Sequence, residues 1–145
     1  MKLLRIVVLG LAVFLAGSAA RAEEWLTDHA AAVKAAEDQH KPIMLFFTGS
    51  DWCIWCKRLQ AEVLNHDEFK QYAEKRLVLM EVDFPQAKSQ PKDVKEQNQK
   101  LLDKYQVEGY PTCVIVDGAG KPLGTLGYMQ GGPKPFLAKL DEILK

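Results

Sequence analysis

The chain has little cysteine: only Cys53, Cys56 and Cys113 in 145 residues. An exported scaffold held together by disulfides usually has a larger and even number. One close pair and one remaining thiol therefore indicate a working disulfide rather than a structural framework. The three histidines are scattered, and no second Cys-x-x-Cys or histidine pair stands at ligand spacing. The sequence thus predicts no metal site.

An excess of charge of one sign is also missing. The chain has 19 basic and 19 acidic residues and a formal net charge of 0. No basic patch stands out, so nucleic acid is not an expected partner. Internal repeats and low-complexity tracts are absent too. With 48% hydrophobic and 26% charged residues, the composition suits one ordinary globular domain.

The first segment has the pattern of a secretory signal peptide. Lys2 and Arg5 precede an uncharged apolar run over 6–16, and small residues follow up to Ala22. A membrane anchor is the alternative, but a spanning helix needs about 20 apolar residues. We therefore expect cleavage near Ala22, which removes residues 1–22, three basic side chains and no acid. The domain at 23–145 is then expected in the periplasm or outside the cell.

Apolar periodicity and turn residues predict alternating helices and strands. Helices are expected over 28–39, 53–64, 67–75 and 93–105 and from 133 onward, and strands over 43–47, 77–82, 112–116 and 122–128. A final hairpin in an otherwise alternating chain implies an α/β fold with a mixed central sheet of about four strands, covered by helices on both faces. The last strand contains Pro122, which favours an edge position. The helix at 93–105 is polar in its middle and is expected on the surface.

Cys53 and Cys56 stand between a predicted buried strand and the helix that follows it. A helix start lowers the pKa of a cysteine placed there. Helical spacing puts Cys56 on the face of Leu59 and Val63, toward the core, and leaves Cys53 at the exposed tip. The sequence therefore predicts that Cys53 is the nucleophile and that Cys56 resolves the mixed disulfide.

Three motifs together match a known family. They are the Trp-Cys-Ile-Trp-Cys-Lys run at 52–57, the Gly-Tyr-Pro-Thr run at 109–112 and Gly127 on the last strand. The chain resembles an exported member of the thioredoxin-like family, and the resemblance extends over about residues 30–144. It implies a thioredoxin-like fold and a thiol–disulfide oxidoreductase that acts on protein disulfides. No cofactor is expected, because the chemistry lies in the two sulfurs.

The resemblance also implies a docking surface around the cysteine pair. In that family a cis-proline lies against the leading cysteine, and this role falls to Pro111. An incoming extended peptide would then meet the backbone before that proline. Trp55 stands between the cysteines on the exposed side, where an aromatic ring suggests contact with a protein partner. The expected substrate-binding residues are Trp52, Trp55, Tyr110, Pro111 and Thr112. Trp52 fits a core position equally well, and Trp25 is expected to pack with the first helix.

The sequence departs from the family at the buried acid that often lies beneath the second cysteine. The strand at 43–47 has no acid, so deprotonation of Cys56 falls to water or to Asp51, Lys57 or Glu62. Cys113 is expected to be a buried core thiol, with a role as an additional soft metal ligand as the alternative.

The residues between the cysteines bear on the direction of electron flow. Ile54 and Trp55 are neither the histidine that accompanies oxidants in the family nor the Gly-Pro of its reductants. Because the pair itself contains no cation, we expect a reductant. We also expect that a membrane electron carrier recharges it and that the protein is a monomer. A disulfide-donating oxidant and a non-enzymatic metallochaperone or binding module remain as alternatives.

Overall fold

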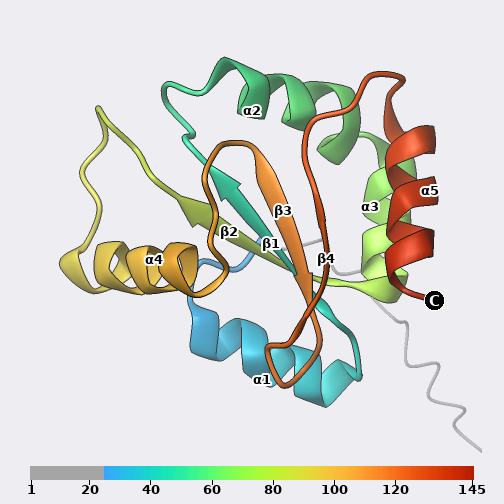
Figure 1. The fold of residues 1–145 in the computed structure, drawn as a ribbon, viewed down its shortest axis with the longest axis horizontal. Helices are drawn as coiled ribbons and strands as arrows, with labels where there is room; N and C mark the ends of the chain where they lie inside the picture. Colours follow the sequence, from blue (N-terminus) through green and yellow to red (C-terminus); the bar gives the residue numbers. More distant parts are fainter. Residues whose placement is uncertain (1–24) are drawn as a thin grey trace, which may run out of the picture.

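The structure is a computed structural model that describes residues 25–145, so the predicted signal peptide lies outside the described residues. A four-stranded sheet with the order β2-β1-β3-β4 forms its centre (Figure 1). The strands are β1 (Ile43–Thr48), β2 (Val78–Asp83), β3 (Thr112–Val116) and β4 (Pro122–Leu126). Strands β1 and β2 run parallel, whereas β3 is antiparallel to both β1 and β4. The predicted mixed sheet, with the proline-containing strand at its edge, is confirmed.

Strand β1 is buried along its whole length. Its run of apolar residues without a charge suits a strand covered on both faces. Successive side chains point to opposite faces of the sheet. Met44 and Phe46 therefore belong to one core cluster, and Leu45 and Phe47 belong to the other. This central strand ends at Thr48, five residues before Cys53, and fixes the base of the site.

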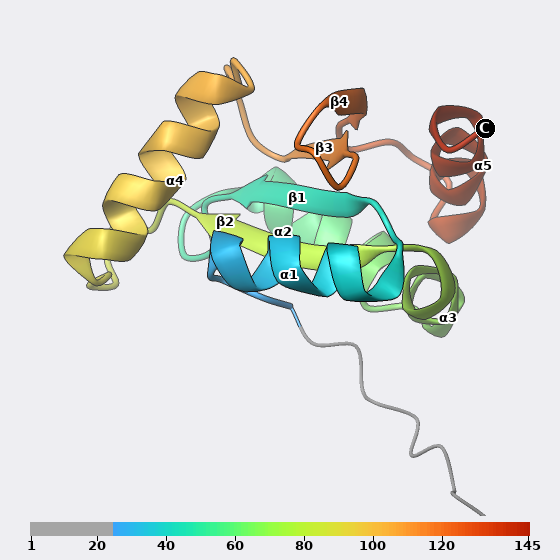
Figure 2. The same cartoon turned by 90° about the horizontal axis from the view of Figure 1, so that it is seen from below.

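Helices cover both faces of the sheet, as predicted (Figures 1 and 2). They are α1 (His29–Gln39), α2 (Ile54–Leu59), α3 (Asp67–Arg76), α4 (Lys92–Lys104) and α5 (Pro133–Ile143). Helices α1 and α4 contribute to one core cluster, and α2, α3 and α5 contribute to the other. The Asp28 side chain caps α1 by accepting the backbone N–H of Ala31 at 2.7 Å. None of the helices in residues 25–145 has both the length and the apolar character needed to cross a bilayer.

The predicted helix at 53–64 is divided in two. Helix α2 ends at Leu59, and a π-helical turn, η1 (Gln60–Leu64), continues it. Cys53 stands before the helix as its N-cap, because its sulfur accepts a backbone N–H that has no partner within the helix. Strand β4 is two residues shorter than predicted. Its pairing stops at Leu126, opposite Cys113. The neighbouring strand β3 begins at Thr112, directly after Pro111, and a proline has no backbone N–H to donate to the sheet.

Two side chains, the aromatic Trp25 and the polar Asn98, lie elsewhere than the sequence predicts. Trp25 does not pack with α1. Its ring is 5.7 Å from that of Phe46, on the other face of the sheet, because the chain at Leu26 pairs in parallel with Met80 of β2. Helix α4 lies on the outside, but its polar Asn98 is buried. The Asn98 amide donates to the carbonyl of Asp83 at 2.9 Å and thereby ties α4 to the end of β2.

Candidate active site around the Cys53–Cys56 disulfide

Four segments of the chain meet at one edge of the sheet. The parallel strands β1 and β2 both end there, and the antiparallel β3 begins there while β4 ends there (Figure 1). This edge therefore collects the segments 49–53, 84–88, 110–111 and 127–128. Strand direction alone brings together residues that are more than 70 positions apart in the sequence.

Cys53 and Cys56 form a disulfide, with 5.3 Å between their Cα atoms. The backbone N–H of Cys56 also donates to the sulfur of Cys53 at 3.2 Å. Cys56 is completely buried, as predicted. Cys53 was expected at an exposed tip, but only 5% of it is exposed. The expectation was wrong because Cys53 precedes the helix, and its sulfur turns back over the first turn instead of pointing outward.

Trp52 forms one wall of the site. Its indole lies over Gly49, where a Cβ atom would overlap the ring. The indole N–H donates to the carbonyl of Phe84 at 2.8 Å. The Tyr110 ring packs edge-on against Trp52 at 5.7 Å and tilted against Phe84 at 5.4 Å. Since 41% of Trp52 is exposed, this residue covers the surface of the site and is not a core residue.

The Tyr110–Pro111 peptide bond is cis, as the resemblance implied. Gly127 lies beside it: a Cβ atom there would be 3.7 Å from the Pro111 carbonyl oxygen. The hydroxyl of Thr112 donates to the carbonyl of Gly109 at 2.7 Å and so closes the turn that contains the proline. Burial raises the pKa of the Tyr110 phenol, which keeps it protonated at neutral pH.

Trp55 lies on the outer side of α2, with 47% of its surface exposed. It is not isolated there. Its ring centre is 5.1 Å from that of Tyr128, and the Arg58 guanidinium lies 5.1 Å above the Trp55 ring. Trp55 and Tyr128 therefore form a second aromatic group next to the cysteine pair, in addition to Trp52.

Asp51 does not serve the cysteines. Its carboxylate accepts three backbone N–H groups from residues 86, 87 and 88, at 3.0, 2.7 and 2.9 Å. These hydrogen bonds, that from Gln86 foremost, hold the pKa of Asp51 at about 2. The Lys57 ammonium donates to the Asp51 carbonyl at 3.3 Å. Both side chains are thus engaged in holding the segments around the site.

Glu62 is engaged as well. It accepts the Tyr128 hydroxyl at 2.6 Å and the Arg58 Nε–H at 3.1 Å. The bond from Tyr128, together with Arg58, lowers the pKa of this carboxyl. The three side chains suggested as proton acceptors for Cys56 thus each have other hydrogen-bond partners among the described residues.

Cys113 lies in the core, as predicted. It is completely buried opposite Phe46 in the sheet, and burial raises the pKa of its thiol to about 12. Within residues 25–145, no group of three or more His, Cys, Asp or Glu side chains is arranged to hold a metal ion.

Phe84 and Tyr128 are site residues that the sequence reasoning missed. A signal for Phe84 was available, because it follows a strand expected to be buried, and parallel strands end at the same edge of a sheet. Tyr128 follows Gly127, which was recognised, but its contact with Trp55 depends on the sheet order.

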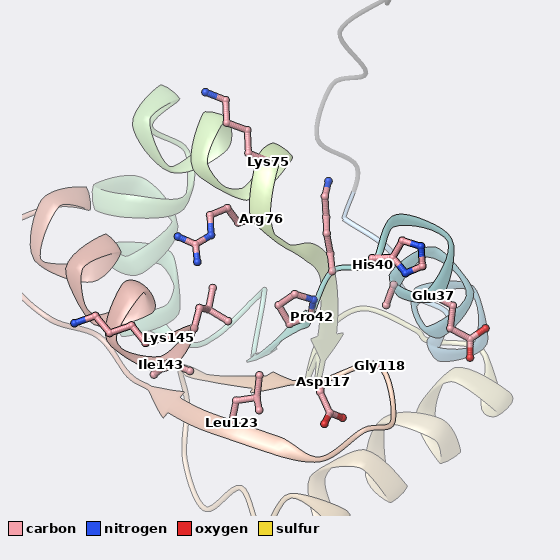
Figure 3. Close-up of a pocket in the computed structure, with 13 residues that line it drawn as sticks. Glu37, His40, Pro42, Lys75, Arg76, Asp117, Gly118, Leu123, Ile143 and Lys145 are labelled. Carbon is pink, nitrogen blue, oxygen red and sulfur yellow. The ribbon is translucent and has the colours of Figure 1, made fainter.

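A pocket of about 860 Å³ lies at the other end of the sheet (Figure 3). Pro42, Leu123 and Ile143 form part of its apolar lining. Pro42 immediately precedes β1, whereas Cys53 follows the opposite end of that strand. The pocket is therefore separate from the disulfide.

Comparison with known proteins gives a consistent result. A family model described as a thioredoxin-like domain matches residues 29–144. The disulfide bond reductase DsbH of Chlamydia pneumoniae is 43% identical over 117 residues, covering 81% of this chain and 70% of the relative. A solved structure of a DsbH oxidoreductase has a TM-score of 0.80 and 41% identity, with 83% of each chain covered.

A thioredoxin from Thermus thermophilus has a TM-score of 0.63 at 21% identity, covering 85% of this chain and 88% of that one, and supports the fold alone. The family model extends over almost all described residues and includes the Cys53–Cys56 pair. The chain is a thiol–disulfide oxidoreductase that belongs to the thioredoxin-like family.

Proposed function

We propose that Cys53 is the nucleophile and that Cys56 is the resolving thiol. The observation that carries this assignment is the hydrogen bond from the Cys56 N–H to the Cys53 sulfur at 3.2 Å. A donor aimed at a sulfur stabilises its thiolate and lowers its pKa. Cys56 has no exposed surface whereas 5% of Cys53 is exposed, so Cys53 is the member of the pair that an external disulfide can reach.

The reaction proceeds in two exchange steps. The Cys53 thiolate attacks one sulfur of a substrate disulfide, whose S–S bond breaks, and the other substrate sulfur leaves and takes up a proton. Cys56 then loses its proton to solvent and attacks the Cys53 sulfur of the mixed disulfide. The second substrate thiol is released, and the Cys53–Cys56 disulfide forms. Two electrons pass from the protein to the substrate, and no cofactor is needed.

The substrate docks as an extended segment along Tyr110 and Pro111. Among the described residues, neither backbone group of Tyr110 has a backbone hydrogen-bond partner. These groups can therefore pair with the backbone of an incoming peptide, as in strand addition. Trp52 and Trp55 border this surface, and Thr112 shapes the turn that leads into it.

The proposed direction is reduction of substrate proteins. No histidine or cation stands between the cysteines. Of the two cations that follow Cys56, Lys57 donates to the Asp51 carbonyl at 3.3 Å and Arg58 is paired with Glu62 at 3.1 Å. A nearby unpaired positive charge would stabilise the reduced thiolate and make the pair more oxidising. The name of the Chlamydia relative, a disulfide bond reductase, agrees with this direction.

The proposed setting is outside the cytoplasm. Removal of residues 1–22 as a signal peptide leads there, and such a reductant requires recharging by a membrane electron carrier. We further propose that the protein acts as a monomer on protein substrates and not on nucleic acid.

The roles of the two cysteines are tested with an unfolded protein disulfide as substrate. Cys53→Ser should abolish turnover, and Cys56→Ser should accumulate a covalent mixed disulfide. Cys113→Ala is the matched control and should keep turnover, because Cys113 is buried in the core. Release of substrate by Cys56→Ser as fast as by the wild type would refute the resolving role.

The direction is tested by the reduction potential of the pair, measured in glutathione or dithiothreitol buffers. A value near or below about −230 mV supports a reductant, whereas one near about −120 mV makes the protein a disulfide donor. A pair that fails to cycle would favour a metal-binding or scaffold role instead.

A further inference from the structure

Four side chains form a connected group beside the disulfide, which we name the Trp55 cluster: Trp55, Arg58, Glu62 and Tyr128. The Arg58 guanidinium lies 5.1 Å from the Trp55 ring centre and 5.6 Å from that of Tyr128. Glu62 binds the Arg58 Nε–H with one oxygen, at 3.1 Å, and the Tyr128 hydroxyl with the other, at 2.6 Å. Each member contacts at least two others, so the cluster is held in place from several sides.

Arg58 is positioned but not fully used by these contacts. Only its Nε–H has a hydrogen-bond partner among residues 25–145, which leaves its two terminal amino groups without one. The side chain is 48% exposed. A guanidinium with a fixed orientation loses less conformational freedom on binding than a flexible ammonium, and its planar fork fits a carboxylate.

The cluster borders the surface on which the substrate is proposed to dock. Trp55 stands between the two cysteines in the sequence. Tyr128 follows Gly127, which lies against the carbonyl of Pro111. A substrate segment that reaches Cys53 therefore passes the exposed ring of Trp55 and the free end of Arg58.

We propose that the Trp55 cluster selects protein disulfides that have an acidic side chain close to the reactive cysteine, next to an apolar one. The apolar side chain packs on Trp55, and the carboxylate accepts hydrogen bonds from the terminal amino groups of Arg58. This inference rests on the proposed function, since it concerns which substrates that site accepts.

Lys57 provides a matched control. It has the same charge as Arg58 and is its neighbour in the sequence, but its ammonium donates to the Asp51 carbonyl and does not stack on either ring of the cluster. If only net charge near the site attracts acidic substrates, Lys57 and Arg58 should contribute equally.

The experiment uses a set of disulfide-bonded peptides. Each peptide has Glu, Gln or Lys at one position, and that position is one of the three on either side of the cysteine. The rate of reduction by the reduced protein is measured at low peptide concentration. At one or more positions we expect the Glu peptide to react about three- to fivefold faster than the Lys peptide, as for one exposed ion pair. Arg58→Gln should remove this preference, whereas Lys57→Gln should retain it.

Equal rates for all peptides, a preference that survives Arg58→Gln, or an equal loss in Lys57→Gln would each overturn the proposal. The uncharged disulfide of 2-mercaptoethanol serves as the reference substrate, and the rate for each peptide is divided by the rate that the same variant shows with this reference. If the protein reduces this reference but shows no preference among the peptides, only the proposed selectivity is refuted. A protein that reduces neither refutes the proposed function.

Discussion

Gly49 is the residue on which the Trp52 wall depends. It is buried, and any Cβ atom there would overlap the indole of Trp52. Displacement of the ring would break its hydrogen bond to the Phe84 carbonyl. We expect Gly49→Ala to change tryptophan fluorescence and to slow reduction of a protein disulfide about fivefold, as for one lost hydrogen bond. Gly118→Ala is the control, because a Cβ atom at Gly118 meets open space. Wild-type fluorescence and rate in Gly49→Ala would contradict this account.

Thr48 has a buried hydroxyl without a partner among the described residues. A polar group withdrawn from water without a hydrogen bond costs free energy, and valine has nearly the same shape without that group. Thr48→Val should therefore raise the free energy of unfolding by about 1 kcal/mol. Urea unfolding measures the effect. The exposed Thr125→Val on β4 should change stability by less than about 0.5 kcal/mol. A less stable Thr48→Val protein would mean that the hydroxyl is satisfied in solution.

At the scale of elements, the segment 84–88 has no secondary structure of its own and is held by Asp51. Because the pKa of Asp51 falls from 3.8 to about 2, folding favours its ionised form. Its contribution to stability is complete above about pH 4 and is lost as the pH falls toward 2. Asp51→Asn should therefore destabilise the protein at neutral pH, and its difference from the wild type should shrink over that interval.

Hydrogen exchange locates the effect of Asp51→Asn. The amides of residues 86–88 should exchange faster, because they lose a carboxylate acceptor. Asp38→Asn, which removes an exposed carboxylate from α1, should leave these amides unchanged. Unchanged protection in Asp51→Asn would show that other contacts hold the segment.

The order and type of the elements could be predicted because their signals are local. The apolar run of β1, the cap at Asp28 and the proline at the start of α5 each act within a few residues. The end of β4 and the division of the predicted helix at 53–64 could not be predicted in this way. The first depends on Pro111, which precedes the neighbouring strand β3. The second arises where the π-helical turn η1 follows α2.

At the scale of the molecule, the cysteine pair, Pro111 and the rings of Trp52, Trp55 and Tyr110 could be recognised from their motifs, but the residues that pack against these rings could not. Phe84 and Tyr128 pack against Tyr110 and Trp55 because β2 and β4 end at the same sheet edge, and this follows from a strand order that the sequence does not state. For the same reason, Asp51 remained a candidate proton acceptor until its bonds to residues 86–88 were known.

Two carboxyl groups have opposite effects on how the stability of the protein depends on pH. Glu62 has a lowered pKa, so its contribution is lost as the pH falls. Glu81 on β2 has a pKa raised above its ordinary 4.5, first by burial and then by Asp83. Folding therefore favours protonated Glu81, and the protein loses stability as the pH rises from about 4.5 through the raised pKa of Glu81.

Glu81→Gln removes this charge while keeping the shape of the side chain. At pH 7 the variant should be more stable than the wild type toward urea, because no ionised group has to be half-buried. At pH 3.5, where Glu81 is protonated, the two proteins should be equally stable. An equal effect of Glu81→Gln at both pH values would mean that Lys88, which opposes the raised pKa, fully compensates the charge.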